Sequence, residues 1–391
     1  LTEVVFKDSK AEKLRPDALL TVHTGHRTWT ALIEAKVGRA EFKPEQIEGY
    51  AALAKSMGVD AVVTISNQFV ALPDHHPTPL PKNLTKHVKL FHWSWMFIIT
   101  QASLLMSGDN ITDNDQKFIL KEMLRFFAHS SSGVSNFDRM NTEWRELVSK
   151  IQAGAELSKV SNDVENTVAS WHQEVRDLAL IMSRKLQCEV TVRLKRTESA
   201  SAIDRLRGDI ESLINDHCLT CSLVIPDAAA PLEVKADLRT RCVSTSMRLA
   251  APSDRKSSKA RTNWLVRMLS KTEPEDVYVR AYWPGRAPTT QAGLLALRED
   301  PEALAAANRQ LVPSSFEVFA IKDFGGRFSG TRTFIEDLEN VIPAFYENVG
   351  QRLSQWQPPP PKIKPELSTT DLDEVEGQLA DSQSGNSEGL T

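Results

Sequence analysis

Alternation of apolar and polar positions near the start of the chain predicts a small sheet. The runs at residues 2–7, 16–22 and 28–37 have the spacing and the β-branched residues of strands. The last two runs are separated by His-Thr-Gly-His-Arg. In this separator Gly25 and His26 fit a two-residue loop, with glycine at the first central position of a type II′ turn. We therefore expect the second and third runs to form a β-hairpin.

The segments that follow predict a βαβ crossover. Residues 41–58 have helical spacing, with Pro44 in the first turn and Gly58 just past the last one. Residues 59–66 are almost wholly apolar, as in a strand that is buried on both faces. A strand, a helix and such a strand predict parallel pairing through a right-handed crossover. After a Pro/His-rich loop at 71–83, the pattern predicts a strand and two helices at residues 88–95, 96–106 and 115–129.

Beyond residue 154 the pattern changes to that of a second, α+β domain. Helices are predicted at residues 164–186, 201–216 and 334–353, the last one bent or broken at Pro343. Strands are predicted at residues 188–196, 219–225, 233–249, 276–283 and 315–324. We thus expect four parts: an α/β core at 1–110, a helical extension at 111–154, the α+β domain at 155–356, and a disordered Pro-rich, acidic tail at 357–391.

The composition, 41% hydrophobic and 25% charged, is typical of a globular protein that builds sizeable cores. No apolar run approaches the roughly 18 residues of a membrane span, so we expect no membrane partner. Four cysteines in 391 residues do not make a disulfide framework, which favours a reducing, cytoplasmic location. The chain starts at Leu1 without an initiator methionine, and we expect it to be cut from a longer protein.

The net charge of −4 hides an uneven distribution. Residues 362–391 hold two lysines and seven acidic residues, a net of −5, so the preceding 361 residues sum to about +1. Residues 235–271 hold ten basic and two acidic residues, a net of +8. Within that stretch a Ser-rich loop beside Trp264 carries Arg255, Lys256, Lys259 and Arg261. Positive charge on a mobile arm near an aromatic residue is typical of nucleic-acid binding, although a solvated basic loop is an equal alternative.

The open end of the expected hairpin brings charged residues together. With the two-residue loop at Gly25, Asp17 lies opposite Glu34, and the Cβ atoms of such a pair are roughly 4.5–5.5 Å apart. Two carboxylates this close repel each other unless a cation lies between them. Because side chains alternate along a strand, Lys36 shares the face of Glu34, while the opposite face is wholly apolar. The hairpin therefore predicts two acids and a lysine at the end of a mostly buried sheet.

These residue types suit metal-assisted chemistry on a phosphate. Paired carboxylates bind Mg²⁺ or Mn²⁺ through oxygen, and such an ion polarises a phosphate and lowers the pKa of a bound water. Lys36 would orient that water and offset charge in the transition state. On the following helix Gln46 and Tyr50 lie four residues apart on one face, which the crossover packs toward the same strand end. Both can donate hydrogen bonds to a phosphate or to a metal-bound water.

The three motifs Arg-Pro-Asp, Glu-Ala-Lys and Gln-Ile-Glu-Gly-Tyr, in this order, resemble the PD…(D/E)xK…QxxxY signature of the PD-(D/E)xK nucleases, and of their RecB-type branch in particular. The resemblance covers roughly residues 1–110 and implies a mixed-sheet, restriction-endonuclease-like αβββαβ core. The first helix of that core, which often supplies a further acid, would precede Leu1. The resemblance further implies Asp17, Glu34 and the backbone carbonyl of Ala35 as metal ligands, Lys36 as the catalytic lysine, and Gln46 and Tyr50 as supporting residues.

Each motif residue also has a structural interpretation. Glu34 and Lys36 could form a solvated pair at a strand edge, Asp17 could be a turn residue, and Gln46 and Tyr50 could be exposed on their helix. A third interpretation keeps the nuclease fold without the activity, but inert relatives usually lose the acid or the lysine, and both are present here. The complete ordered set favours the nuclease interpretation over any single triplet.

Other clusters predict less. Cys218 and Cys221 lie two residues apart in a C-x-x-C arrangement, but Cys188 and Cys242 are isolated, so we expect core cysteines rather than a zinc site. His75 and His76 lie in the Pro-rich loop and are expected to be exposed. We predict a Mg²⁺- or Mn²⁺-dependent nuclease with DNA favoured over RNA as substrate, acting in repair, restriction or phage defence. The alternative is an inert nuclease-like module that binds nucleic acid or a protein partner, and a homodimer is left open.

Overall fold

The computed structural model describes residues 14–78, 86–108, 111–159, 161–308 and 310–358. The chain divides into two compact units, Leu1–Trp356 and Gln357–Thr391. The strand predicted at 2–7 lies outside the described residues, and so does the predicted tail from residue 359 onward. The described part contains two separate sheets, each with its own hydrophobic core.

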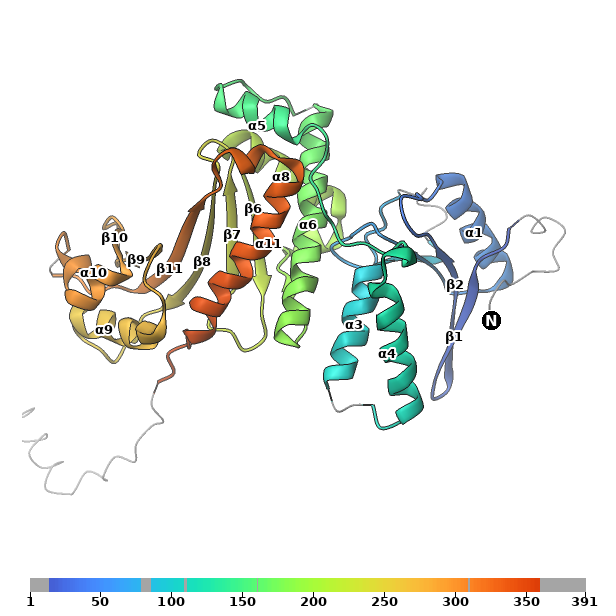
Figure 1. Cartoon of the computed structure of the whole chain (residues 1–391), viewed down its shortest axis with the longest axis horizontal. Helices are drawn as coiled ribbons and strands as arrows, with labels where there is room; N and C mark the ends of the chain where they lie inside the picture. The colour runs from blue at the N-terminus through green and yellow to red at the C-terminus, as the bar shows by residue number, and fades with distance from the viewer. Residues whose placement is uncertain (1–13, 79–85, 109–110, 160, 309, 359–391) are drawn as a thin grey trace, which may run out of the picture. The chain divides into compact units, whose positions relative to one another are not determined.

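The first sheet is mixed and has the strand order β1-β2-β3-β4 (Figure 1). Its strands are β1 (Ala18–Thr24), β2 (Arg27–Ala35), β3 (Ala61–Ser66) and β4 (Lys89–Ser94). β1 and β2 are antiparallel, whereas β2, β3 and β4 run parallel to one another. All six residues of β3 are buried, which confirms the expectation of a strand covered on both faces. The chain is therefore α/β with a mixed sheet in this part.

The hairpin has the register that the sequence predicts. Thr24 pairs with Arg27 and Ala18 pairs with Ile33, around a loop in which Gly25 has φ +58°. A positive φ at the first loop position is what a type II′ turn requires, and glycine adopts it without a steric penalty. One residue beyond the last pair, Asp17 and Glu34 lie at the open end of the hairpin.

Two helices cover the two faces of this sheet. α1 (Pro44–Met57) starts at a proline and ends at Gly58, which is in the left-handed conformation and whose N–H bonds back to the carbonyl of Ala54. On the α1 face the core joins Leu32 and Val62 of the sheet to Tyr50 and Leu53 of the helix. On the other face α3 (Trp95–Ser107) packs through Trp95 and Ile98 against a core of Ala31, Ala61, Val63 and Ile65.

Two further helices follow. The helix predicted at 115–129 is α4 (Asn114–Ala128), and its N-cap Asp113 accepts hydrogen bonds from the backbone N–H groups of Asp115 and Gln116. None of the residues of α4 is buried. After a 3₁₀ turn, η1 (Ser130–Ser132), the helix α5 (Trp144–Gln152) buries Trp144, Leu147, Val148 and Ile151 in the core of the second sheet.

The second sheet is antiparallel and has the order β10-β9-β11-β8-β7-β6-β5. Its strands are β5 (Thr191–Val192), β6 (Cys218–Val224), β7 (Leu232–Asp237), β8 (Cys242–Ala250), β9 (Val277–Tyr282), β10 (Thr290–Gly293) and β11 (Ser315–Asp323). Buried and exposed residues alternate along β7 and β8. This alternation is expected for a sheet with one face on a core and one face toward solvent.

Helices cover the buried face of the second sheet. The long helices α6 (Asn162–Leu186) and α11 (Thr331–Asn348) contact each other and the sheet (Figure 1). Their core contains the fully buried rings of Trp144, Trp171, Phe316, Phe328 and Phe334. The remaining elements are α7 (Arg196–Ala200), α8 (Ala202–Asp216), α9 (Ser258–Met268), η2 (Leu269–Lys271), α10 (Leu294–Glu299), η3 (Ala303–Ala305), η4 (Gly325–Ser329) and η5 (Gly350–Arg352).

Several sequence predictions for this part were wrong. The strand expected at 188–196 is reduced to Thr191–Val192, because the backbone N–H of Val190 bonds to the hydroxyl of Ser183 on α6. The stretch 233–249 is two strands, since the carboxylate of Asp237 accepts the N–H groups of Arg239 and Thr240 and turns the chain. The predicted break at Pro343 is also absent: α11 continues through Pro343 to Asn348, with buried apolar residues before and after the proline, whereas the alternative prediction of a bend stays a prediction.

Among the helices of the described ranges, none is both long enough and apolar enough to cross a membrane.

Candidate functional site

Glu34 occupies the end of β2 and is the centre of a hydrogen-bonded cluster. It is only 4% exposed. Its Oε1 accepts hydrogen bonds from Nζ of Lys36 at 2.6 Å and from Nε2 of Gln46 at 2.8 Å. Its Oε2 accepts one from the hydroxyl of Tyr50 at 2.9 Å. A buried carboxylate is costly unless donors surround it, and here three side chains from the β2 end and α1 provide them.

Tyr50 stays protonated in this cluster and acts as a donor. Burial raises the pKa of its hydroxyl to about 12; the hydrogen bond from Gln46 opposes this rise, and the negative charges of Glu34 and Asp17 add to it. The same hydroxyl lies 3.1 Å from the carbonyl oxygen of Arg15 and 3.3 Å from Nε2 of Gln46. Tyr50 therefore links α1 to both segments that carry the predicted acids.

Lys36 is held through its backbone while its side chain reaches the cluster. Its N–H donates to the carbonyl of Ile65 at 2.8 Å, and its carbonyl accepts from the indole of Trp95 at 2.7 Å. The side chain is 26% exposed and forms an ion pair with Glu34. Lys36 thus lies between the buried carboxylate and solvent, where a substrate could approach it.

Asp17 joins the same strand end through the backbone. Its Oδ2 accepts the N–H of Ala35 at 2.7 Å. In a regular strand the N–H and C=O of one residue point toward the same neighbouring strand, so the carbonyl of Ala35 is directed to the side of Asp17. The structure therefore places Asp17, Glu34 and the Ala35 carbonyl at one end of β2. Among the described residues no group of three or more His, Cys, Asp and Glu side chains could hold a metal ion.

A second polar cluster adjoins Glu34, and the sequence did not reveal it. Glu34 pairs in register with Thr64 of β3, which pairs with His92 of β4, so these three residues form a row on one face of the sheet. The hydroxyl of Thr64 lies 2.8 Å from Nδ1 of His92 and 2.7 Å from Nε2 of His76. His75 and His76, expected to be exposed, are both half-buried instead.

The hydrogen bonds that join His92, Thr64 and His76 all run in one direction. Nε2 of His92 donates to the carbonyl of Gln68 at 3.0 Å, so its Nδ1 accepts from Thr64. The Thr64 oxygen then accepts from His76, whose Nδ1 accepts the N–H of Thr78 at 2.9 Å. Burial lowers the pKa of both imidazoles to about 4. Both histidines are therefore neutral at physiological pH, and they fix the loop 67–78 on the sheet.

The four predicted nucleic-acid-binding residues do not form one basic loop. Lys259 and Arg261 belong to α9, contrary to the expectation of a Ser-rich loop, because Ser257 caps that helix through the N–H of Ala260. The guanidinium of Arg261 donates to the carbonyls of Arg255 and Pro313, at 2.8 and 2.7 Å. Lys256 and Lys259 are exposed, but the cavity that they line also contains the acids Asp300 and Glu302.

The two cysteines of the C-x-x-C arrangement lie on β6 and are buried, as expected for core cysteines. Burial raises the pKa of the Cys221 thiol far above its ordinary value. A thiol that stays protonated is a poor metal ligand and a poor nucleophile.

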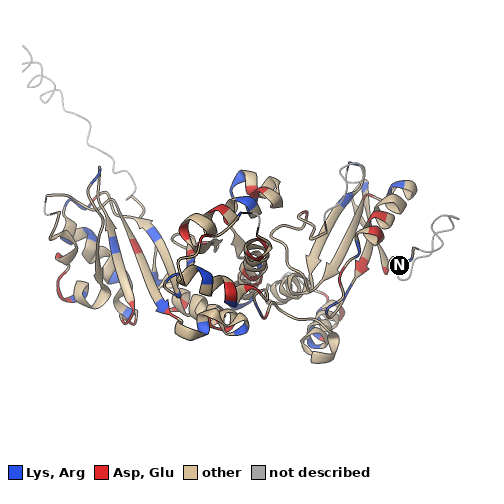
Figure 2. Cartoon of the chain, turned by 90° about the horizontal axis from the view of Figure 1, so that it is seen from above, with Lys and Arg blue, Asp and Glu red and all other residues tan. Residues whose placement is uncertain are grey.

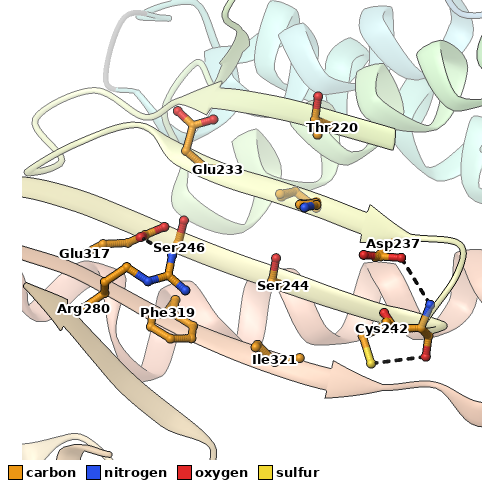
Figure 3. Close-up of a pocket in the computed structure, with 13 residues that line it drawn as sticks. Thr220, Glu233, Asp237, Cys242, Ser244, Ser246, Arg280, Glu317, Phe319 and Ile321 are labelled. Atoms are coloured by element: carbon orange, nitrogen blue, oxygen red, sulfur yellow. Dashed lines mark hydrogen bonds and ion pairs between the residues drawn. The ribbon is translucent and has the colours of Figure 1, made fainter. Parts of the chain in front are cut away.

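A cavity of about 570 Å³ lies on the open face of the second sheet (Figure 3). Both acidic and basic side chains line the cavity, and among them Arg280 forms a 2.9 Å ion pair with Glu317. None of the predicted site residues lines it. Figure 2 likewise shows basic and acidic residues interspersed over the described part of the chain. We therefore take the end of β2 as the candidate catalytic site.

Comparisons with family models, with curated proteins and with solved structures find no match for this chain.

Proposed function

We propose that this protein is a metal-dependent nuclease with a PD-(D/E)xK, restriction-endonuclease-like core of the RecB-type branch. The observation that carries the proposal is the convergence of Lys36, Gln46 and Tyr50 on the buried carboxylate of Glu34, beside Asp17. A chance set of short motifs would not be expected to meet at one strand end. The mixed β1-β2-β3-β4 sheet, with α1 as the crossover from β2 to β3, also fits such a core.

The residues present fit a Mg²⁺ or Mn²⁺ ion. Asp17, Glu34 and the Ala35 carbonyl would supply three oxygen ligands, and these hard cations take oxygen ligands and retain several waters. Asp17 uses one carboxylate oxygen for Ala35, and Oε2 of Glu34 has a single donor, so lone pairs remain for a cation. When bound, the ion would polarise a phosphate and lower the pKa of a water ligand.

The remaining side chains have defined tasks in this proposal. The ammonium group of Lys36, partly exposed beside Glu34, would offset the negative charge that develops on the scissile phosphate and orient the attacking water. Gln46 and Tyr50 hold Glu34 and each other through three hydrogen bonds. The imidazoles of His76 and His92 would not serve as general bases, because each has both ring nitrogens engaged in the chain through Thr64.

DNA is the favoured substrate, and the exposed Lys256 and Lys259 on the second part of the chain are candidates for additional phosphate contacts. Arg261 is less suited, because its guanidinium is engaged with two carbonyl groups. Cytoplasmic nucleic-acid repair, restriction or phage defence would be consistent with such an enzyme. The proposal leaves open whether the protein acts as a homodimer or with a protein partner.

A second candidate function is nucleic-acid or protein binding without cleavage. One observation favours it: both carboxylate oxygens of Glu34 are already occupied by donors of the chain itself. In that case the cluster would serve only to attach α1 to the sheet.

A cleavage panel separates the two functions. Linear duplex DNA, circular duplex DNA, single-stranded DNA and RNA are incubated with the protein, with Mg²⁺, with Mn²⁺ and with a chelator. The nuclease proposal expects metal-dependent cleavage that Asp17→Ala and Lys36→Ala abolish, whereas Lys55→Ala, an exposed lysine of α1, retains it. Absence of cleavage with every substrate would leave the binding function, and cleavage by Lys36→Ala at the wild-type rate would contradict a nuclease site at the end of β2.

A further inference from the structure

Arg205 on α8 is a largely buried residue whose guanidinium has an ion pair but no hydrogen bond within the described part of the chain. The residue is only 6% exposed. Its guanidinium carries five N–H donors, yet none of them donates to another described residue within hydrogen-bond distance. Its nearest charged neighbour is Asp209, whose Oδ2 lies 3.8 Å from Nε. That oxygen is already bonded to Nε2 of His172 at 2.6 Å. No nitrogen of Arg205 is among the buried side-chain atoms without a partner in the described residues, so its guanidinium reaches the adjoining cavity, where its donors are available to an acceptor from outside the chain.

A cavity of about 470 Å³ opens beside Arg205. It lies next to β6, where the short strand β5 ends, and adjoins the cavity of Figure 3 at Thr220 and Glu233. Its polar walls come from the segment before α7 and from the sheet. Three basic and three acidic residues line it: Arg193, Lys195 and Arg205 against Glu198, Asp209 and Glu233.

Most of these acids are engaged within the chain. Glu198 accepts the backbone N–H of Lys195 at 2.9 Å and pairs with its ammonium group at 2.9 Å. Glu233 accepts from the hydroxyl of Ser222 at 2.8 Å. By contrast, Arg193 is exposed and has no ion pair with any residue in the described ranges. The cations that retain free donors are therefore Arg205 inside the cavity and Arg193 at its mouth.

We propose that this cavity binds one oxyanion group, a carboxylate or a phosphate, through the guanidinium of Arg205. A planar guanidinium matches the two oxygens of such a group in a bidentate arrangement. Since the basic and acidic residues of the lining balance, a group with one negative charge fits better than a polyanion. Arg193 at the mouth attracts the anion and contacts it on entry. The cavity shares no residue with the cluster around Glu34, and oxyanion binding there does not require nuclease activity.

The oxyanion has two sources, a free small anion or the phosphodiester of a nucleic acid. Isothermal titration calorimetry with the full chain, at constant ionic strength, tests inorganic phosphate, acetate and a dinucleoside monophosphate in separate arms. We expect saturable one-to-one binding in at least one arm, weakened at least tenfold by Arg205→Gln and severalfold by Arg193→Gln. Binding in the dinucleotide arm alone would identify the nucleic-acid source; binding of phosphate or acetate would identify a free anion.

The matched control is Arg207→Gln, an exposed arginine two residues along α8 that pairs with Asp204. It should bind like the wild type. Absence of saturable binding in every arm, or equal affinity in wild type and Arg205→Gln, would overturn the proposal. If circular dichroism shows that Arg205→Gln does not fold, the exposed Arg193→Gln decides: unchanged affinity in that variant contradicts the site.

Discussion

Nζ of Lys36 lies 2.6 Å from Oε1 of Glu34, so the two charged residues of the Glu-Ala-Lys triplet form an ion pair inside the candidate site. This pair occupies an oxygen that a metal ion would use. Lys36→Met should therefore bind Mn²⁺ several-fold more tightly than the wild type while losing cleavage. Calorimetric titration with Mn²⁺ measures the affinity. A weaker affinity in the variant would show that Lys36 supports metal binding instead of competing with it.

The hydroxyl of Tyr50 is the only hydrogen-bond donor to Oε2 of Glu34 within the described part of the chain. Tyr50→Phe leaves that buried oxygen short of a partner, and the free energy of unfolding should fall by about 1–3 kcal/mol. Urea unfolding measures the change. Tyr278→Phe, on the exposed face of the second sheet, is the control and should alter stability by less than about 0.5 kcal/mol. Equal effects of the two substitutions would argue against a special role for the Glu34 cluster.

Thr64 connects the buried His92 of β4 to the half-buried His76 of the loop 67–78. Thr64→Val removes the acceptor of His76 and the donor to His92, and the free energy of unfolding should fall by about 2 kcal/mol. Thr64→Ser keeps the hydroxyl and should lose much less. In the wild type, NMR titration should place both imidazole midpoints near pH 4, because burial disfavours the charged form. A midpoint near 6.5, the ordinary value, for either histidine would contradict the hydrogen-bonded arrangement of His76, Thr64 and His92.

The buried Asp177 and the half-buried Glu339, beside the core of the second sheet, make the stability of the protein depend on pH. Burial raises the pKa of Glu339 to about 7 and that of Asp177 to about 6, and the charge of Asp177 adds to the rise at Glu339. A folded-state pKa above the unfolded value means that stability is present at low pH and is lost as pH rises. For Glu339 this loss runs from about pH 4.5 to pH 7.

Glu339→Gln should therefore stabilise the protein at about pH 8 and change it little at about pH 5. Thermal unfolding at the two pH values measures the difference. Glu347→Gln, an exposed acid of the same helix, is the control and should have no pH-dependent effect. If Glu339→Gln and Glu347→Gln change the thermal stability equally at the two pH values, the raised pKa of Glu339 is contradicted.

The first sheet could be predicted because its signals are local. The loop at Gly25 fixes the register that places Asp17 near Glu34, and the four-residue spacing of Gln46 and Tyr50 places them on one helix face. His92 and Thr64 escaped prediction because their relation to Glu34 depends on the parallel register of three strands, which no local pattern specifies. In the second part, α9 went unrecognised because its basic and serine residues resemble a loop, and tertiary contacts of Arg261 decide its conformation.

The central claim is that Glu34 belongs to a metal-dependent nuclease site. The most direct test is the initial rate of duplex DNA cleavage in Mg²⁺ by wild type, by Glu34→Gln and by Glu41→Gln, an exposed acid of the following loop. The claim predicts that Glu34→Gln retains its fold and loses at least a hundredfold in rate, while Glu41→Gln cuts like the wild type. Cleavage by Glu34→Gln at the wild-type rate, or no cleavage by the wild type, would contradict it.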